Sequence, residues 1–162
     1  MSDNVVRASM ELVNGRAKFS ASVTGQPALS VDYIPPVGDG EGYTSLELLL
    51  ISMGTCLGTA VKSLVEHRLK KKVDSLSVGA MGERREKHPT SFSRVTLWLD
   101  IACQGLSGEE LVGVIHNAEA NICPVLDMVK GNTEIVVKPH LFGLAVGASE
   151  SRDGEPIEEA SA

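Results

Sequence analysis

The stretch TSLELLLISMGTCLGTAVKSLVEH, residues 44–67, decides the fold of this chain. Its apolar residues recur three or four positions apart, which predicts a helix rather than a strand. Thr44 and Glu47 match a capping box, in which each side chain satisfies a backbone N–H group of the other residue. No charged residue lies between Leu48 and Val61. We therefore expect a core helix that is covered on nearly all sides.

Length and composition indicate one soluble domain. The chain has 162 residues, and the predicted domain covers residues 1–147, followed by an acidic, disordered tail at 148–162. A net charge of −6 argues against a nucleic-acid partner. The uncharged run of the helix is shorter than the roughly 18 to 20 residues that cross a bilayer, and the polar start MSDN is no Sec-type signal. The sequence therefore predicts a cytoplasmic protein without a membrane partner.

Strand patterns lie on both sides of the helix. Three strands are predicted before it, with Asn14-Gly15 as the first hairpin turn, at residues 5–12, 17–24 and 28–34. Three more are predicted after it, the last ended by Pro139, at residues 73–81, 92–103 and 133–138. The glycines of segment 38–42 predict a flexible entry to the helix, because their spacing does not match a phosphate-binding loop.

A second helix is predicted to begin at the capping box formed by Ser107 and Glu110. Pro124 interrupts its pattern, so either the helix kinks there or a new helix begins with Pro124 at its first position. Strands interrupted by two helices predict an α+β fold. We expect two long helices packed on one antiparallel six-stranded sheet.

The cysteines are the first candidates for chemistry. Their odd number and the absence of a Cys-X-X-Cys pair argue against a disulfide scaffold or a zinc ribbon. A buried cysteine usually packs as a small apolar side chain, and we expect this of Cys103 at a strand end. No metal-ligand spacing joins a cysteine to His67, His88 or His140, so no metal site is predicted.

Two cysteines lie at special places in the predicted helices. Cys56 lies between Gly54 and Gly58, which would let another helix or a substrate approach closely. Cys123 precedes Pro124 and becomes an N-cap if a helix begins there, where the positive end of the helix dipole would favour a thiolate. Either both cysteines are structural, or they share a catalytic role.

His116 and Glu119 share a helix face with Cys123, seven and four positions before it. This leaves a Cys–His hydrolase that uses Cys123 and His116 as an alternative. A neighbouring carboxylate raises the pKa of a thiol rather than lowering it. A surface His–Glu pair is therefore the simpler interpretation.

Three segments carry a family resemblance: TSLELLLISMGTCLGTAVKSLVEHR (44–68), GERREKHPTSFSRVTLWLDIAC (82–103) and AEANICPVLDMVK (118–130). Together they resemble the OsmC/Ohr family, particularly its YhfA-like branch, from about Val5 to Pro139. The strongest feature is a cysteine on the first long helix combined with a Cys-Pro on the second. The resemblance implies an intertwined homodimer of the OsmC-like fold, in which wrapped sheets cover the two long apolar helices.

The same resemblance implies a thiol-dependent peroxidase of organic hydroperoxides, with an antioxidant role in oxidative stress. Cys56 would be the peroxidatic thiol, oxidised to a sulfenic acid, and Cys123 the resolving thiol that condenses with it to a disulfide. An external dithiol reductant would restore both thiols, without a metal or flavin cofactor. The alternative is a non-catalytic, stress-associated dimeric binding protein with vestigial cysteines.

In the characterised family members, an arginine from the first hairpin and a glutamate at the start of the long helix hold the thiolate. Arg16, directly after the first turn, is the candidate arginine. The family glutamate lies ten residues before the cysteine, a position that Leu46 occupies here. Glu47 is the nearest carboxylate, but nine residues put it about 13.5 Å away and on the opposite side of the helix from Cys56. We expect it to serve as a cap.

Overall fold

The computed structural model describes residues 4–142, so the predicted tail at 148–162 lies outside the described residues. The strands before the first helix are β1 (Ser9–Leu12), β2 (Phe19–Ser22) and β3 (Leu29–Val31). Helix α1 (Ser45–Ser63) continues into a π-helical turn, η1 (Leu64–Arg68). The remaining elements are β4 (Val73–Arg84), β5 (Phe92–Cys103), α2 (Gly108–Asn117), η2 (Ala118–Ile122), α3 (Pro124–Val129) and β6 (Glu134–Phe142).

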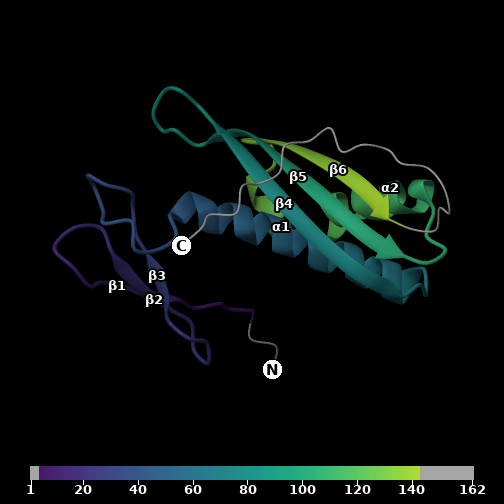
Figure 1. Cartoon of the computed structure of the whole chain (residues 1–162), viewed down its shortest axis with the longest axis horizontal. Coiled ribbons are helices and arrows are strands. Elements are labelled where there is room, and N and C mark those ends of the chain that lie inside the picture. The colour runs from purple at the N-terminus through teal and green to yellow at the C-terminus, as the bar shows by residue number, and fades with distance from the viewer. Residues whose placement is uncertain (1–3, 143–162) are drawn as a thin grey trace.

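The strands form two separate sheets, not the single six-stranded sheet that we expected. The first sheet has the order β1-β2-β3, and the second has the order β4-β5-β6. In Figure 1 the first sheet lies beside the start of α1, apart from the second sheet. Periodicity predicts which face a strand residue occupies but not which strands pair, so the division was not visible in the sequence.

The second sheet is mixed, which also corrects the antiparallel expectation. Strands β4 and β5 pair antiparallel, whereas β5 and β6 pair parallel, with Val95 opposite Ile135 and Leu97 opposite Val137. Parallel neighbours need a crossover of a dozen or more residues, usually helical. The segment from α2 to α3 is that crossover. Strand β6 also passes through Pro139 to Phe142, because an edge strand tolerates a proline that cannot donate a hydrogen bond.

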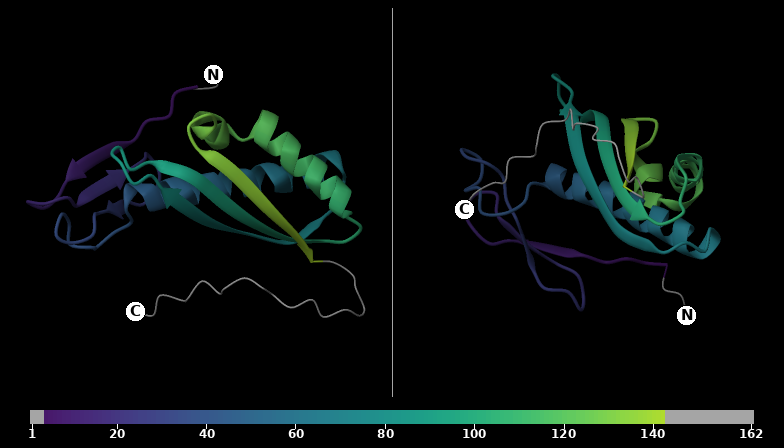
Figure 2. Two further views of the ribbon diagram at one scale, coloured as in Figure 1. Left: turned by 90° about the horizontal axis from the view of Figure 1, so that it is seen from above. Right: turned by 45° about the vertical axis from the view of Figure 1, so that its right-hand side comes forward.

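Helix α1 and the second sheet share one hydrophobic core. The inward side chains of β5 are fully buried, and they are Val95, Leu97, Leu99 and Ile101. Met53, Leu57 and Val61 of α1 are buried at four-residue spacing, as one face of a helix requires. Figure 2 shows α1, α2 and β4–β6 together in this half of the molecule. The predicted amphipathic strand β5 is therefore confirmed.

By length and composition, the helix Ser45–Arg68 could cross a membrane, with a mean hydropathy of 1.7. The whole helix has 24 residues and is therefore longer than the uncharged run on which the expectation rested. Core helices meet the same criterion, and α1 packs against β4, η2 and α3. Length and hydropathy alone therefore do not assign the helix to a bilayer.

The two predicted capping boxes are confirmed. The side chain of Thr44 accepts a hydrogen bond from the backbone N–H of Glu47, and that carboxylate accepts one from the backbone N–H of Thr44. Ser107 and Glu110 make the same pair of bonds at α2. Each box satisfies N–H groups that have no partner inside the helix. The second long helix, however, is interrupted into α2, η2 and α3.

Candidate functional site

Helix α1 fixes the position of Cys56. The buried Leu57 and Met53 anchor the helix on the core, and Cys56 lies between them in sequence on an adjoining face. Its side chain is half-buried and packs against the core cluster. A thiol here is held by a rigid element and still has one side open to the surface.

Cys123 is held at the junction where the π-helical turn η2 ends and helix α3 begins. Its backbone N–H donates to the carbonyl oxygen of Ala118 at 2.8 Å, and its own carbonyl oxygen accepts from the N–H of Asp127 at 3.1 Å. The residue is extended, with φ −84° and ψ 101°, and α3 begins at Pro124. Of the two alternatives left open by the sequence, the new helix is therefore the one observed, with Cys123 as its N-cap.

The fold brings the two thiols into contact across 67 positions of sequence. The Sγ atom of Cys123 donates to the Sγ atom of Cys56 at 2.8 Å. Both cysteines are free thiols, with Cys123 buried and Cys56 half-buried. Two sulfurs this close need little movement to form a disulfide. The arrangement can therefore perform thiol–disulfide chemistry.

Burial keeps Cys123 protonated. Burial first, and the hydrogen bond with Cys56 second, together raise the pKa of the Cys123 thiol to about 11. The backbone N–H groups of Leu126 and Val125 lower it only in part. The N-cap position favours the thiolate through these N–H groups, as expected, but desolvation of the charged form outweighs them.

The structure does not bring Arg16 to either thiol of the same chain. Its Nη1 atom donates to Asp39 Oδ1 at 2.6 Å, and its Nη2 atom donates to the carbonyl oxygen of Pro36 at 2.5 Å. Glu47 is engaged as the cap of α1, where its Oε2 atom accepts from the backbone N–H of Thr44 at 2.7 Å. Within the part of the chain that the structure describes, neither residue has a hydrogen bond to Cys56.

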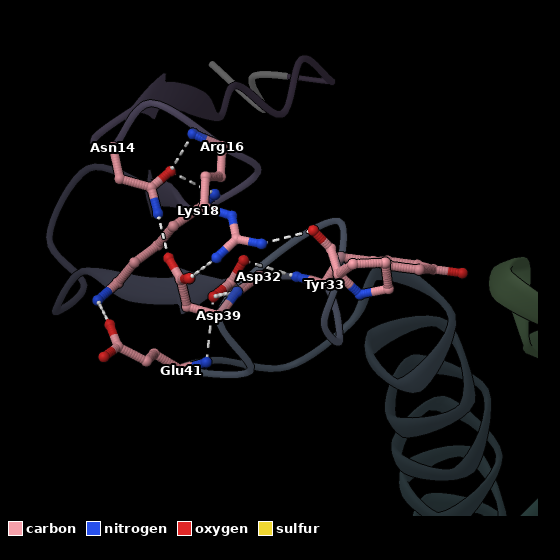
Figure 3. A network of polar contacts seen from close by, with 8 residues as sticks. Asn14, Arg16, Lys18, Asp32, Tyr33, Asp39 and Glu41 are labelled. Atoms are coloured by element: carbon pink, nitrogen blue, oxygen red, sulfur yellow. Dashed lines mark hydrogen bonds and ion pairs between the residues drawn. The ribbon is translucent and has the colours of Figure 1, made fainter.

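The loop before α1 is held by a network of polar contacts, which Figure 3 shows. Asp32 is 1% exposed, and its carboxylate accepts backbone N–H groups from Tyr33 at 2.7 Å and from Asp39 and Glu41 at 3.1 Å. Burial opposes the charge on Asp32, but these three N–H groups and Lys18 together lower its pKa. The glycine-rich entry is thus tied down, not flexible as predicted.

Sequence reasoning missed Asp32 and Asp39. The available signal was an acidic side chain inside the alternating strand pattern at 28–34, directly before two prolines and a glycine-rich loop. A buried carboxylate persists only where hydrogen bonds stabilise it, and the nearest donors in sequence are the backbone N–H groups of the loop that follows. Asp32 therefore marks the loop as an ordered one.

Gly54 and Gly58 face strand β4, not another helix, and both also line a groove that is open to a ligand. A Cβ atom at Gly58 would lie 3.2 Å from Val78 Cγ2, and one at Gly54 would lie 3.4 Å from Val78 Cγ1. The two glycines let β4 approach α1 closely. An open groove of about 880 Å³ runs along the same face between α1 and β4, on the side of α1 away from Cys56.

The remaining sequence candidates lie outside this thiol pair. His116 is exposed, and burial raises the pKa of Glu119 although the nearby His116 opposes it. Burial also raises the pKa of Cys103, whose Sγ atom lies 3.9 Å from the carbonyl oxygen of Gln104. Among residues 4–142, no group of three or more His, Cys, Asp or Glu side chains could hold a metal ion.

Comparisons with known proteins give the same fold. The family model described as "OsmC-like protein" matches residues 38–138. A hypothetical protein from Aquifex aeolicus VF5 superposes with a TM-score of 0.75 at 22% identity, covering 88% of this chain and 99% of that one. No curated protein sequence gives a significant match.

Two further solved structures cover a similar share of the chain. An OsmC-like protein of unknown function from Vibrio cholerae has a TM-score of 0.74 at 16% identity, covering 85% of this chain and 99% of that one. An organic hydroperoxide resistance protein from Elizabethkingia anophelis has a TM-score of 0.66 at 20% identity, covering 88% and 100%. Identities this low show a common fold. Because the family model spans more than half of the sequence, this chain belongs to the OsmC/Ohr family.

Proposed function

We propose that this protein is a thiol-dependent peroxidase that reduces organic hydroperoxides, with Cys56 as the peroxidatic and Cys123 as the resolving thiol. The observation that carries the proposal is the contact between the two Sγ atoms at 2.8 Å. Structural neighbours named organic hydroperoxide resistance proteins support it at the level of the family. Membership of the YhfA-like branch stays a prediction.

The difference in exposure supports the division of roles. A peroxidatic sulfur must meet its substrate, and Cys56 is the more exposed of the pair. Cys123 is 2% exposed and held as a protonated thiol, so it is protected from direct oxidation. It reacts only with a neighbour that presents an electrophilic sulfur. A sulfenic acid on Cys56 is such a neighbour.

The proposed reaction has three balanced steps. The Cys56 thiolate attacks the outer oxygen of the hydroperoxide, the O–O bond breaks, and a proton on the departing oxygen completes an alcohol and a sulfenic acid. The Cys123 thiol then loses its proton, its sulfur bonds to the Cys56 sulfur, and water leaves. Finally, an external dithiol reduces the disulfide by exchange and is itself oxidised to a disulfide.

A second copy of the chain is the proposed partner. In the first sheet, cross-strand neighbours share a face: Met10, Ala21 and Leu29 form one row and Leu12, Phe19 and Val31 the next. The opposite face carries serines and Glu11. Met10 and Leu12 are 63% and 50% exposed. A small sheet needs a covered apolar face to be stable, and a homodimer would supply that cover.

A homodimer also gives Arg16 a role. The side chain of Arg16 is bound by the loop that immediately precedes α1. Cys56 lies twelve residues beyond the Thr44 cap, about 18 Å along the helix axis. We propose that Arg16 of one copy approaches the Cys56 sulfur of the other and stabilises its thiolate. Glu47 is proposed to act only as the cap of α1.

The groove between α1 and β4 favours a second candidate function, a dimeric binding protein with vestigial cysteines. Apolar side chains and glycines make up most of its wall, including Leu50, Ile51 and Val78. An apolar ligand of modest size would fit such a groove. The groove and the thiols face different sides of α1, so the two functions can be tested separately.

The test of the peroxidase proposal measures consumption of cumene hydroperoxide by the reduced protein with dithiothreitol as reductant. We expect turnover by the native chain, none by Cys56→Ser, and a sulfenic acid on Cys56 that dimedone traps in Cys123→Ser. Cys103→Ser is the matched control and should retain turnover. If Cys56→Ser consumes hydroperoxide as fast as the native chain, the peroxidase proposal is wrong and the binding protein remains.

A further inference from the structure

We propose that Asp39 is a positioning residue that orients the Arg16 guanidinium toward the thiol site. This inference rests on the role proposed above for Arg16, and it goes beyond that role by naming what holds the arginine in place. The residue is not on α1 and is not the helix-cap carboxylate. It lies in the loop between β3 and α1.

Asp39 uses both carboxylate oxygens to connect two loops. Its Oδ1 atom accepts from Arg16 Nη1 at 2.6 Å, and its Oδ2 atom accepts from Asn14 Nδ2 at 2.8 Å. The carbonyl oxygen of Pro36 accepts from Arg16 Nη2 at 2.5 Å. These contacts fix the plane of the guanidinium. They occupy two of its five N–H donors, and the other N–H groups remain to meet an anion.

Asp39 is itself held by the buried Asp32. Its backbone N–H donates to Asp32 Oδ2 at 3.1 Å, and the N–H of Glu41 donates to the same oxygen at 3.1 Å. A Cβ atom at Gly38 would lie 2.0 Å from the carbonyl oxygen of Tyr33, so the chain packs too tightly there to move freely. Figure 3 shows the carboxylate of Asp39 between the first turn and this loop.

The positioning role follows from the exposure of the pair. The side chains of Arg16 and Asp39 are 47% and 33% exposed, and an arginine this exposed would otherwise sample many rotamers. Two directed hydrogen bonds restrict it before any anion binds, which removes the entropic cost of ordering it later. Without Asp39 the Arg16 side chain would populate many rotamers, and a smaller fraction of molecules would have the guanidinium oriented toward a thiolate.

The test compares the alkylation of Cys56 by iodoacetate and by iodoacetamide, because only the anionic reagent senses a positive charge near the sulfur. The measured ratio is the rate with iodoacetate divided by the rate with iodoacetamide. We expect Arg16→Ala and Asp39→Asn each to lower this ratio about fivefold, the effect of one partly exposed ion pair. Loss of the Asp39 charge alone would raise the ratio. A fall therefore reports the displacement of Arg16.

The double variant separates positioning from general damage. If Asp39 acts through Arg16, adding Asp39→Asn to Arg16→Ala should change nothing further. Asp39→Glu should recover much of the ratio. Glu41→Gln is the matched control: it removes the neighbouring ion pair of Lys18 and Glu41 at 2.6 Å without touching Arg16, and it should leave the ratio unchanged.

The outcomes distinguish this inference from the peroxidase proposal. Hydroperoxide turnover that requires Cys56, combined with a ratio that Asp39→Asn leaves unchanged or raises, overturns the role of Asp39 and leaves the enzyme standing. If the ratio falls in both variants but the native chain does not turn over hydroperoxide, the positioning role of Asp39 is supported and the peroxidase proposal is contradicted. A double variant that falls by the product of the two single effects would also overturn the inference.

Discussion

The protonation of Cys123 leads to a quantitative prediction about its reactivity. A rise of its pKa from the ordinary 9.0 to about 11 lowers the thiolate fraction at neutral pH about a hundredfold. Only the thiolate is alkylated. We therefore expect iodoacetamide to modify Cys123 in the folded chain at least about 100-fold more slowly than in the same chain unfolded in urea. Quenched time points, digestion and mass spectrometry of the Cys123 peptide measure both rates.

The dependence on pH has a definite sign. A thiol with a raised pKa stays protonated as the pH passes through its ordinary value, so the rate at Cys123 should increase about tenfold for each pH unit up to about 10. Burial is the larger cause of the shift and the bond with Cys56 the second. Cys56→Ala should therefore raise the alkylation rate of Cys123, but not to the rate of the unfolded chain. Modification of Cys123 at the rate of the unfolded chain would refute the buried, protonated thiol.

The remaining predictions concern assembly and stability. Phe19→Glu should convert a dimer into a monomer in light scattering, whereas Ser20→Glu, on the other face of the sheet, should not; two unchanged dimers would contradict the proposed interface. Thr44→Ala should lower the free energy of unfolding in urea by about 1 kcal/mol, because α1 loses its cap. Gly113→Ala, with nothing within 4 Å of the new Cβ, should raise it by about 0.5–1 kcal/mol, whereas Gly58→Val should lower it by roughly 1–3 kcal/mol. A stabilised Gly58→Val protein would show that β4 does not press on α1.

The long elements were predictable because their signals are local. Capping at Thr44 and Ser107 and the alternation of β5 depend on residues close together in sequence. The short strands were predicted too long, as at 5–12 where β1 covers only Ser9–Leu12. Within residues 4–142 their apolar face stays largely exposed, so packing there does not reinforce the local propensity.

The direction of β6 could have been inferred and was not. Strand β5, the helical segment and β6 form a β-α-β unit, and its length fits a parallel crossover. The expectation of one antiparallel sheet rests on runs of strands interrupted by two helices, a pattern that does not specify strand direction. A proline usually ends a strand, and the tolerance of β6 for Pro139 depends on its place at the sheet edge, which the sequence does not display.

The candidate site was only partly visible in the sequence. Cys56 and Cys123 were selected from their helical surroundings, but their contact depends on the π-helical turn η2, which has no recognised sequence signal. The polar network around Asp32 depends on folding a loop back onto a strand. Such contacts join residues that no periodic pattern connects, so Asp39 emerged only from the structure.

The most direct test of the account is the bond that the hydroperoxide should create. Reduced native chain would be treated with one equivalent of cumene hydroperoxide, blocked with iodoacetamide, digested without reductant and analysed by mass spectrometry. The account predicts one cross-linked species that joins the Cys56 and Cys123 peptides, with Cys103 alkylated. Consumption of the hydroperoxide with Cys56 and Cys123 still unlinked would contradict the central claim that these two sulfurs act as a redox pair.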